Sequence, residues 1–167
     1  MTEPAASAAP SPINAPRVFL VVVDETEEMR MALRYACRRA QRTKGRVALL
    51  YVIEPLEFQH WLGVGRVMEA EARDEAEQRV QALAAEVFAQ TGTIPVIHIR
   101  EGARAEQLAA LLQEDHTISL LVLGTARGGS NPGPLVTYLL SNLGRRIKLP
   151  VTLVPGELTP EEIDALT

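Results

Sequence analysis

Five short apolar runs recur along the chain, and longer segments with helical periodicity separate them. The runs are continuous in aliphatic and β-branched residues, which is typical of strands that are buried on both faces. They span residues 18–23, 47–53, 94–99, 118–123 and 151–154. Strands that are joined by helical crossovers lie parallel. The pattern therefore predicts an α/β fold: one three-layer sandwich around a five-stranded, mainly parallel sheet. Pro95 marks the third run as a strand at an edge or at its beginning.

The four connecting segments repeat apolar residues at spacings of three and four, as helices with one buried face do. The first has the apolar positions Met29, Ala32, Leu33, Ala36, Cys37 and Ala40. The other three helices are predicted over about 68–92, 105–112 and 134–147. In the last of these, Leu140 and Leu143 are expected to face the core.

The two ends of the chain differ from the region between them. Residues 1–16 are mostly Ala, Pro and Ser, which predicts a disordered tail. Residues 157–167 contain a capping-box pattern, with Thr159 as the cap, Pro160 at the first helical position and Glu162 completing the box. We therefore expect one domain over 17–156, followed by a short helix over 157–167.

Composition excludes several classes of function. The chain has 17 Lys and Arg against 21 Asp and Glu, a net charge of −4, which disfavours nucleic-acid binding. Cys37 is the only cysteine, which suits a reducing compartment and a packed thiol. The three histidines lie far apart, so no metal site is expected, and His98 is predicted on the solvent face of its strand. No apolar run approaches the roughly 18 residues of a membrane span. We expect a cytoplasmic protein.

Ligands of parallel sheets bind beyond the carboxyl ends of the strands, near the point where strand order reverses. Asp24 follows the first strand. It could accept a hydrogen bond from a ligand, although capping of the next helix is the favoured interpretation. The loop Gly124–Pro134 is rich in glycine and precedes a helix. It could direct backbone N–H groups at phosphate oxygens, or it could simply turn the chain.

Three further features admit more than one interpretation. Phe58–Leu62 is either a lid over a ligand or a strut pinned by Trp61, and the strut is favoured. The cations Arg145, Arg146 and Lys148 suit the end of a helix for dipole reasons. A phosphoacceptor receiver domain shares the predicted element order. It needs a carboxylate at the end of the third strand, where this chain has Arg100-Glu101, and an acidic pair at the first strand, where Asp24-Glu25 could serve, so this interpretation is weakened and stays open.

Several motifs occur in an order that resembles the universal stress protein family, over Arg17–Pro155. They are VVVD at 21–24, ALRYA at 32–36, VALLYVIEP at 47–55, Gly102, LLVLG at 120–124 and LPVTLVP at 149–155. The resemblance implies a fold of the universal stress protein and adenine-nucleotide hydrolase type. It also implies a homodimer that pairs through the last strand, at Val151 and Leu153.

In nucleotide-binding members of that family, the matching Asp and the backbone near Val52 face adenine. The loop after the fourth strand resembles Gly-x2-Gly-x9-Gly-Ser/Thr and wraps the ribose and phosphates. In this chain the second and third glycines fall on Arg127 and Thr137, and Tyr138 takes the hydroxyl position. An insertion of one residue would bring Gly128 into the second place. The resemblance thus gives these candidate cofactor-binding residues: Asp24, Val52, Gly124, Arg127, Gly128, Thr137 and Tyr138.

Two functions follow as expectations. The first is a non-catalytic stress-response module that acts as a homodimer, with an unidentified protein partner and with weak or lost ATP binding. The alternative is an adenine-nucleotide sensor that binds ATP, with Mg²⁺ only alongside it, through Asp24, Val52 and the 124–138 loop. A hydrolase is a weaker third possibility, and the sequence assigns no catalytic residues to it.

Overall fold

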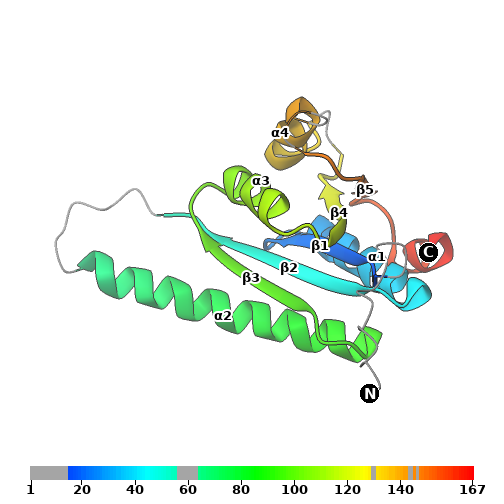
Figure 1. Ribbon diagram of the computed structural model, residues 1–167, viewed down its shortest axis with the longest axis horizontal. Coiled ribbons are helices and arrows are strands. Elements are labelled where there is room, and N and C mark those ends of the chain that lie inside the picture. Colours follow the sequence, from blue (N-terminus) through cyan, green and yellow to red (C-terminus); the bar gives the residue numbers. More distant parts are fainter. Residues whose placement is uncertain (1–14, 56–63, 129–130, 143–144, 146) are drawn as a thin grey trace, which may run out of the picture.

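The computed structural model describes residues 15–55, 64–128, 131–142, 145 and 147–167. All five apolar runs form strands, and helices fill the connections between them (Figure 1). In chain order the elements are β1 (Val18–Val23), α1 (Glu27–Thr43), β2 (Arg46–Ile53), α2 (Val64–Thr91), β3 (Val96–Glu101), α3 (Arg104–Glu114), β4 (Ile118–Thr125), α4 (Pro134–Asn142), β5 (Val151–Pro155) and α5 (Pro160–Leu166). Most of the predicted tail and all of the predicted lid or strut at 58–62 lie outside the described residues.

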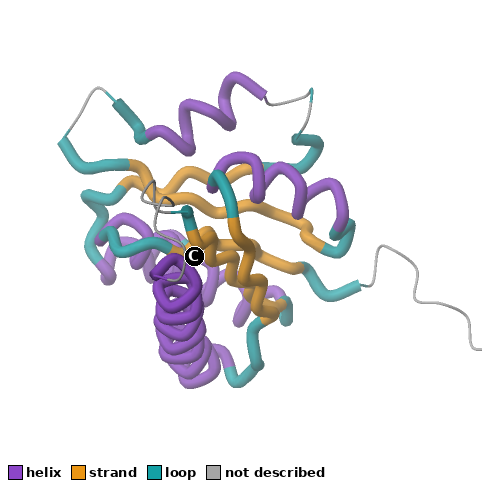
Figure 2. The backbone as a smooth tube through the Cα atoms, turned by 90° about the vertical axis from the view of Figure 1, so that its left-hand side faces the viewer, coloured by secondary structure: helices purple, strands orange, loops and turns teal. Residues whose placement is uncertain are grey.

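The sheet has the order β3-β2-β1-β4-β5, and all four pairings are parallel. Strand order reverses between β1 and β4. Helices α1, α2 and α5 pack on one face of the sheet, and α3 and α4 pack on the other, as the tube in Figure 2 shows. The predicted three-layer α/β fold is therefore confirmed. The predicted edge position of the third strand is also confirmed, because β3 begins directly after Pro95 at one edge.

The apolar runs are continuous because both faces of the central strands are covered. All six residues of β1 are buried. Val21 enters the core under α1 and α2, whereas its neighbour Leu20 enters the second core under α3 and α4. A strand with only one buried face would alternate apolar and polar residues instead. On α1, the six apolar positions given by its periodicity are all buried.

Two helix starts show how local chemistry sets the boundaries. The capping box of α5 is present as predicted, with the Thr159 and Glu162 side chains each accepting a backbone N–H bond from the other residue. Asp24 does not cap α1, however. Thr26 is the cap, and its hydroxyl accepts from the Met29 N–H at 3.2 Å. Asp24 supports that cap from two residues upstream, since its Oδ1 accepts from the Thr26 N–H and hydroxyl.

The predicted end of the fourth helix is wrong. Helix α4 stops at Asn142, and Leu140 is 56% exposed rather than facing the core. The side chains of Thr137, Ser141 and Asn142 each donate to the carbonyl four residues earlier, and side-chain bonds of this kind disfavour a longer helix. Ile147 is buried beyond the helix, and Leu143 lies outside the described residues.

His98 also differs from its prediction. Its side chain is only 20% exposed, because the end of α3 covers this part of β3 and places Asp115 Oδ2 3.8 Å from His98 Nε2. This burial lowers the pKa of the imidazole. Cys37 is packed as predicted, and burial raises the pKa of its thiol to about 12. Among the described residues, no helix has both the length and the apolar character needed to cross a membrane.

Candidate functional site

The candidate residues of the first two strands meet at the carboxyl edge of the sheet, next to the reversal of strand order. The register of β1 with β2 ends at Val23 and Tyr51, so Asp24 and Val52 occupy the next position along the two strands. Val52 is buried and belongs to the α3 side of the core. The structure thus brings these two sequence-predicted residues together.

The carboxylate of Asp24 already has partners within the chain. Its Oδ1 accepts hydrogen bonds from the Thr26 N–H at 2.8 Å and from the Thr26 hydroxyl at 2.5 Å. Its Oδ2 lies 4.0 Å from Arg104 Nη1. Arg104 Nη2 in turn lies 3.5 Å from Glu54 Oε2. One guanidinium therefore links the residues that follow β1 and β2. Any ligand that hydrogen-bonds to Asp24 must share the carboxylate with Thr26 and Arg104.

Sequence reasoning missed Arg104, which is the first residue of α3. The available signal is its place two residues after Gly102, beyond the carboxyl end of β3, where a parallel sheet directs side chains at the ligand edge. Its Nε is buried without a hydrogen-bond partner among the described residues. Asp24, Glu54 and Arg104 come from three segments that are distant in sequence, so a local sequence pattern does not predict their contact.

Gly124 is explained by helix packing. A Cβ at this position would lie 2.2 Å from the carbonyl oxygen of Glu28 and 2.4 Å from its carbonyl carbon. The first turn of α1 therefore rests directly on the backbone of β4. Gly156 meets the same turn, since its Cβ would lie 2.9 Å from the Glu28 Cβ. Glycine is required here by the close approach of two backbones, with or without a phosphate.

The groups that follow β4 are bound to the segment that follows β5. Arg127 Nε donates to the Gly156 carbonyl at 2.6 Å. Gly128 adopts a φ of +62°, and its N–H donates to Glu157 Oε1 at 2.8 Å. A carboxylate of the chain thus occupies a loop amide of the kind that binds phosphate oxygens in glycine-rich loops.

Thr137 and Tyr138 lie within α4. The Thr137 hydroxyl donates at 2.9 Å to the carbonyl of Gly133, the residue directly before the helix. The Tyr138 ring packs against the core on the α3 and α4 face, and its hydroxyl is buried with no partner among the described residues. In the described residues, neither hydroxyl is hydrogen-bonded to Gly156 or Glu157, the residues that bind Arg127 and Gly128.

The carboxyl edge carries several paired charges and more than one cavity, including one of about 520 Å³ lined by Glu27, Arg127 and Glu157. Arg79 is paired with Glu25, and Arg30 with Glu86. A cavity of about 290 Å³ opens beside Asp24, between the first turn of α1 and the middle of α2. Cavities for small ligands usually measure about 300–1,000 Å³. The described residues include no group of three His, Cys, Asp or Glu side chains that could hold a metal ion.

Comparison with solved structures gives many proteins of one fold. Universal stress protein UspA from Lactobacillus plantarum is 21% identical, with a TM-score of 0.67 over 84% of this chain and 99% of that one. A universal stress protein family member from Burkholderia pseudomallei is 18% identical, with a TM-score of 0.64 over 87% and 99%. One from Arabidopsis thaliana, solved with AMP bound, is 11% identical, with a TM-score of 0.59 over 84% and 92%.

These identities are low, so the structural likeness establishes the fold alone. A search of curated proteins gave no match. The sequence model of the universal stress protein family, however, matches residues 16–155, which include every strand and the helices α1 to α4. This chain belongs to the universal stress protein family.

Proposed function

We propose that this protein is a non-catalytic module of the stress response, which acts as a homodimer and binds ATP weakly or not at all. One observation carries the proposal for ATP: the Glu157 carboxylate accepts the N–H of Gly128 in the loop after β4. A phosphate that reached this amide would have to displace Glu157 and would then lie beside its negative charge. The chain supplies its own anion at this position.

Two side chains support the same conclusion. Glycine-rich phosphate loops work because their backbone can approach the ligand closely. Arg127 and Thr137 stand where nucleotide-binding members have glycines, and both are engaged within the chain. Arg127 could otherwise serve as a phosphate ligand, but its Nε is bonded to the Gly156 carbonyl at the end of β5. A triphosphate would find these donors already in use.

The proposal of a homodimer rests on β5, which among the described residues pairs with β4 alone and has its outer edge open. Leu153 is 39% exposed on this strand. An apolar edge strand with unpaired backbone groups promotes association with another strand. A second copy of β5 across a two-fold axis would satisfy both sheets at once.

The test is calorimetric titration of nucleotide-stripped protein with ATP and Mg²⁺, together with chromatography of nucleotide released from the protein as purified. We expect no co-purified nucleotide and no saturable heat at micromolar ATP. Glu157→Ala frees the Gly128 amide and removes a negative charge, so we expect it to strengthen ATP binding.

The matched control is Glu161→Ala, which removes the same charge from the first turn of α5 without touching the loop. Equal effects of the two variants would show that only net charge matters and would contradict the role of Glu157. Micromolar ATP binding by the unmodified chain would overturn the proposal.

A second candidate, an adenine-nucleotide sensor, is favoured by the meeting of Asp24 and Val52 at the edge of the sheet. The relative from Arabidopsis thaliana was solved with AMP, which demands less of a phosphate loop than ATP does. Titration with AMP separates the two candidates. Micromolar AMP binding that Asp24→Ala abolishes would establish the sensor.

A further inference from the structure

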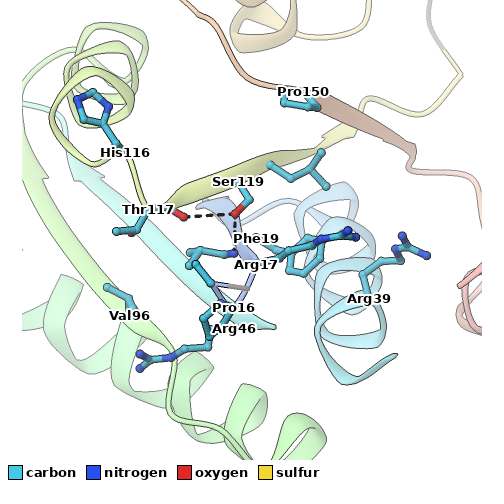
Figure 3. Close-up of a pocket in the computed structure, with 13 residues that line it drawn as sticks. Pro16, Arg17, Phe19, Arg39, Arg46, Val96, His116, Thr117, Ser119 and Pro150 are labelled. Carbon is cyan, nitrogen blue, oxygen red and sulfur yellow. Dashed lines mark hydrogen bonds between the residues drawn. The ribbon is translucent and has the colours of Figure 1, made fainter. Parts of the chain in front are cut away.

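A cavity of about 890 Å³ opens at the amino ends of β1 and β4, the opposite end of the sheet from the candidate site (Figure 3). Its charged lining residues are all basic: Arg17 before β1, Arg39 on α1 and Arg46 at the start of β2. His116 also lines it, and the described lining includes no Asp or Glu. The protein has a net charge of −4, so this is a local reversal of its overall charge.

Two of these arginines are free to act together. Figure 3 shows the guanidinium groups of Arg17 and Arg39 directed to the same side of the cavity, whereas Arg46 points away and donates to the Ile94 carbonyl. Within the described part of the chain, no carboxylate lies within 4.0 Å of Arg17 or Arg39. By contrast, their neighbours Arg34 and Arg38 on α1 both pair with Asp164.

The helix dipole does not account for this arrangement. Cations are favoured at the carboxyl end of α1, but Arg42 already stands in its last turn, and Arg17 is not part of the helix. The positive region also continues into a neighbouring cavity of about 470 Å³, which shares His116 and adds Arg145 and Lys148. Asp115, the one acid among the described residues that line this second cavity, already accepts hydrogen bonds from Thr117.

We propose that the larger cavity binds a small phosphate monoester with an apolar body. Arg17 and Arg39 hold the phosphate, because guanidinium groups form paired, charge-assisted bonds with phosphate oxygens. The apolar body lies against the apolar part of the lining, where Leu120 and Pro150 are accessible. The volume falls within the range of small-molecule sites, and the adjoining cations favour the approach of an anion.

The test uses phenyl phosphate as the probe and follows the Nε–Hε signals of the arginines by NMR. We expect saturable shifts of Arg17 and Arg39 at millimolar probe or below, and weaker binding of both inorganic phosphate and phenol. Arg17→Gln and Arg39→Gln should each weaken binding about fivefold, as the loss of one exposed charged contact does. Arg42→Gln is the matched control, because it removes a charge from the same helix end outside the cavity lining.

Three results would overturn the proposal. These are shifts that do not saturate, an equal loss of affinity in Arg42→Gln, and binding of inorganic phosphate as tight as that of phenyl phosphate. The same variants also separate this cavity from the carboxyl edge. AMP is a phosphate monoester, so a heat of AMP binding that persists in Asp24→Ala and disappears in Arg17→Gln would come from the amino-end cavity and would support the proposal.

Discussion

Gly124 lies where the backbone of β4 meets the first turn of α1, with no room for a side chain. Gly124→Ala must push the Glu28 carbonyl away, and backbone cannot yield as a flexible side chain can. We expect the free energy of unfolding to fall by about 3 kcal/mol, as for an overpacked core position. Denaturant unfolding at neutral pH measures this change.

Gly65→Ala is the control, because a Cβ there would meet nothing within 4 Å and the residue lies in α2. This variant should be as stable as the unmodified protein or slightly more stable, since Ala favours helix. An unchanged stability in Gly124→Ala would contradict the packing explanation and would return Gly124 to a role in ligand binding.

Asp24 and Arg104 show where residue-level reasoning from the sequence stops. The position of Asp24 after a buried strand predicted its place at the ligand edge. The sequence did not reveal that Thr26 takes the cap and that Asp24 braces it. Arg104 becomes a neighbour of Asp24 only when β3 has been placed two strands away from β1. Contacts of this kind depend on strand order, which local spacing does not encode.

At the scale of elements, α5 is joined to α1 by two arginines that share one carboxylate. Arg34 and Arg38 each donate two hydrogen bonds to Asp164, over 2.7–2.9 Å. The bonds from Arg38 and then from Arg34 hold the pKa of the Asp164 carboxyl well below its usual value. A lowered native pKa means that the ionised carboxylate stabilises the fold above the unfolded pKa, about 4, and that this stabilisation is lost as pH falls further.

Asp164→Asn should therefore lower the melting temperature by a few degrees at pH 7. The gap between variant and unmodified protein should narrow as pH falls below about 4, because protonation then removes the same interaction from the unmodified chain. Calorimetric melting curves across this range provide the measurement. Asp74→Asn, on an exposed position of α2, is the control and should leave the melting temperature unchanged. A gap that stays constant with pH would contradict the ion-pair explanation.

The elements themselves were well predicted wherever one period governed the segment. The strands could be predicted because both faces of the sheet are covered, which makes their sequences continuously apolar. Helix α1 could be predicted because its buried residues recur at a regular helical spacing. Helix α4 was predicted too long because its apolar spacing continues past Asn142. The side chains of Ser141 and Asn142 bond back to the preceding turn, which disfavours a longer helix and which apolar spacing does not report. Hydrophobic period identifies an element better than it locates its end.

At the scale of the whole molecule, the decisive prediction is the homodimer. In the described part of the chain, the outer edge of β5 pairs with no other strand and carries the partly exposed Leu153, a combination that favours pairing with a second copy. Sedimentation at micromolar concentration should give twice the chain mass of 18.2 kDa. Leu153→Glu places a charge on this edge and should give the monomer, with the fold retained by circular dichroism.

The control is Phe88→Glu, because Phe88 is also apolar and is even more exposed than Leu153, but it lies on α2, which packs beside the opposite edge of the sheet. This variant should remain a dimer. A monomeric unmodified protein at micromolar concentration would contradict the proposed assembly, and loss of the dimer in Phe88→Glu alone would move the interface to the α2 side.

The amino-end cavity includes Pro150, directly before β5, so the dimer and its Leu153→Glu monomer should also be compared for phenyl phosphate binding. A weaker affinity in the monomer would show that pairing of β5 and the geometry of this cavity are coupled.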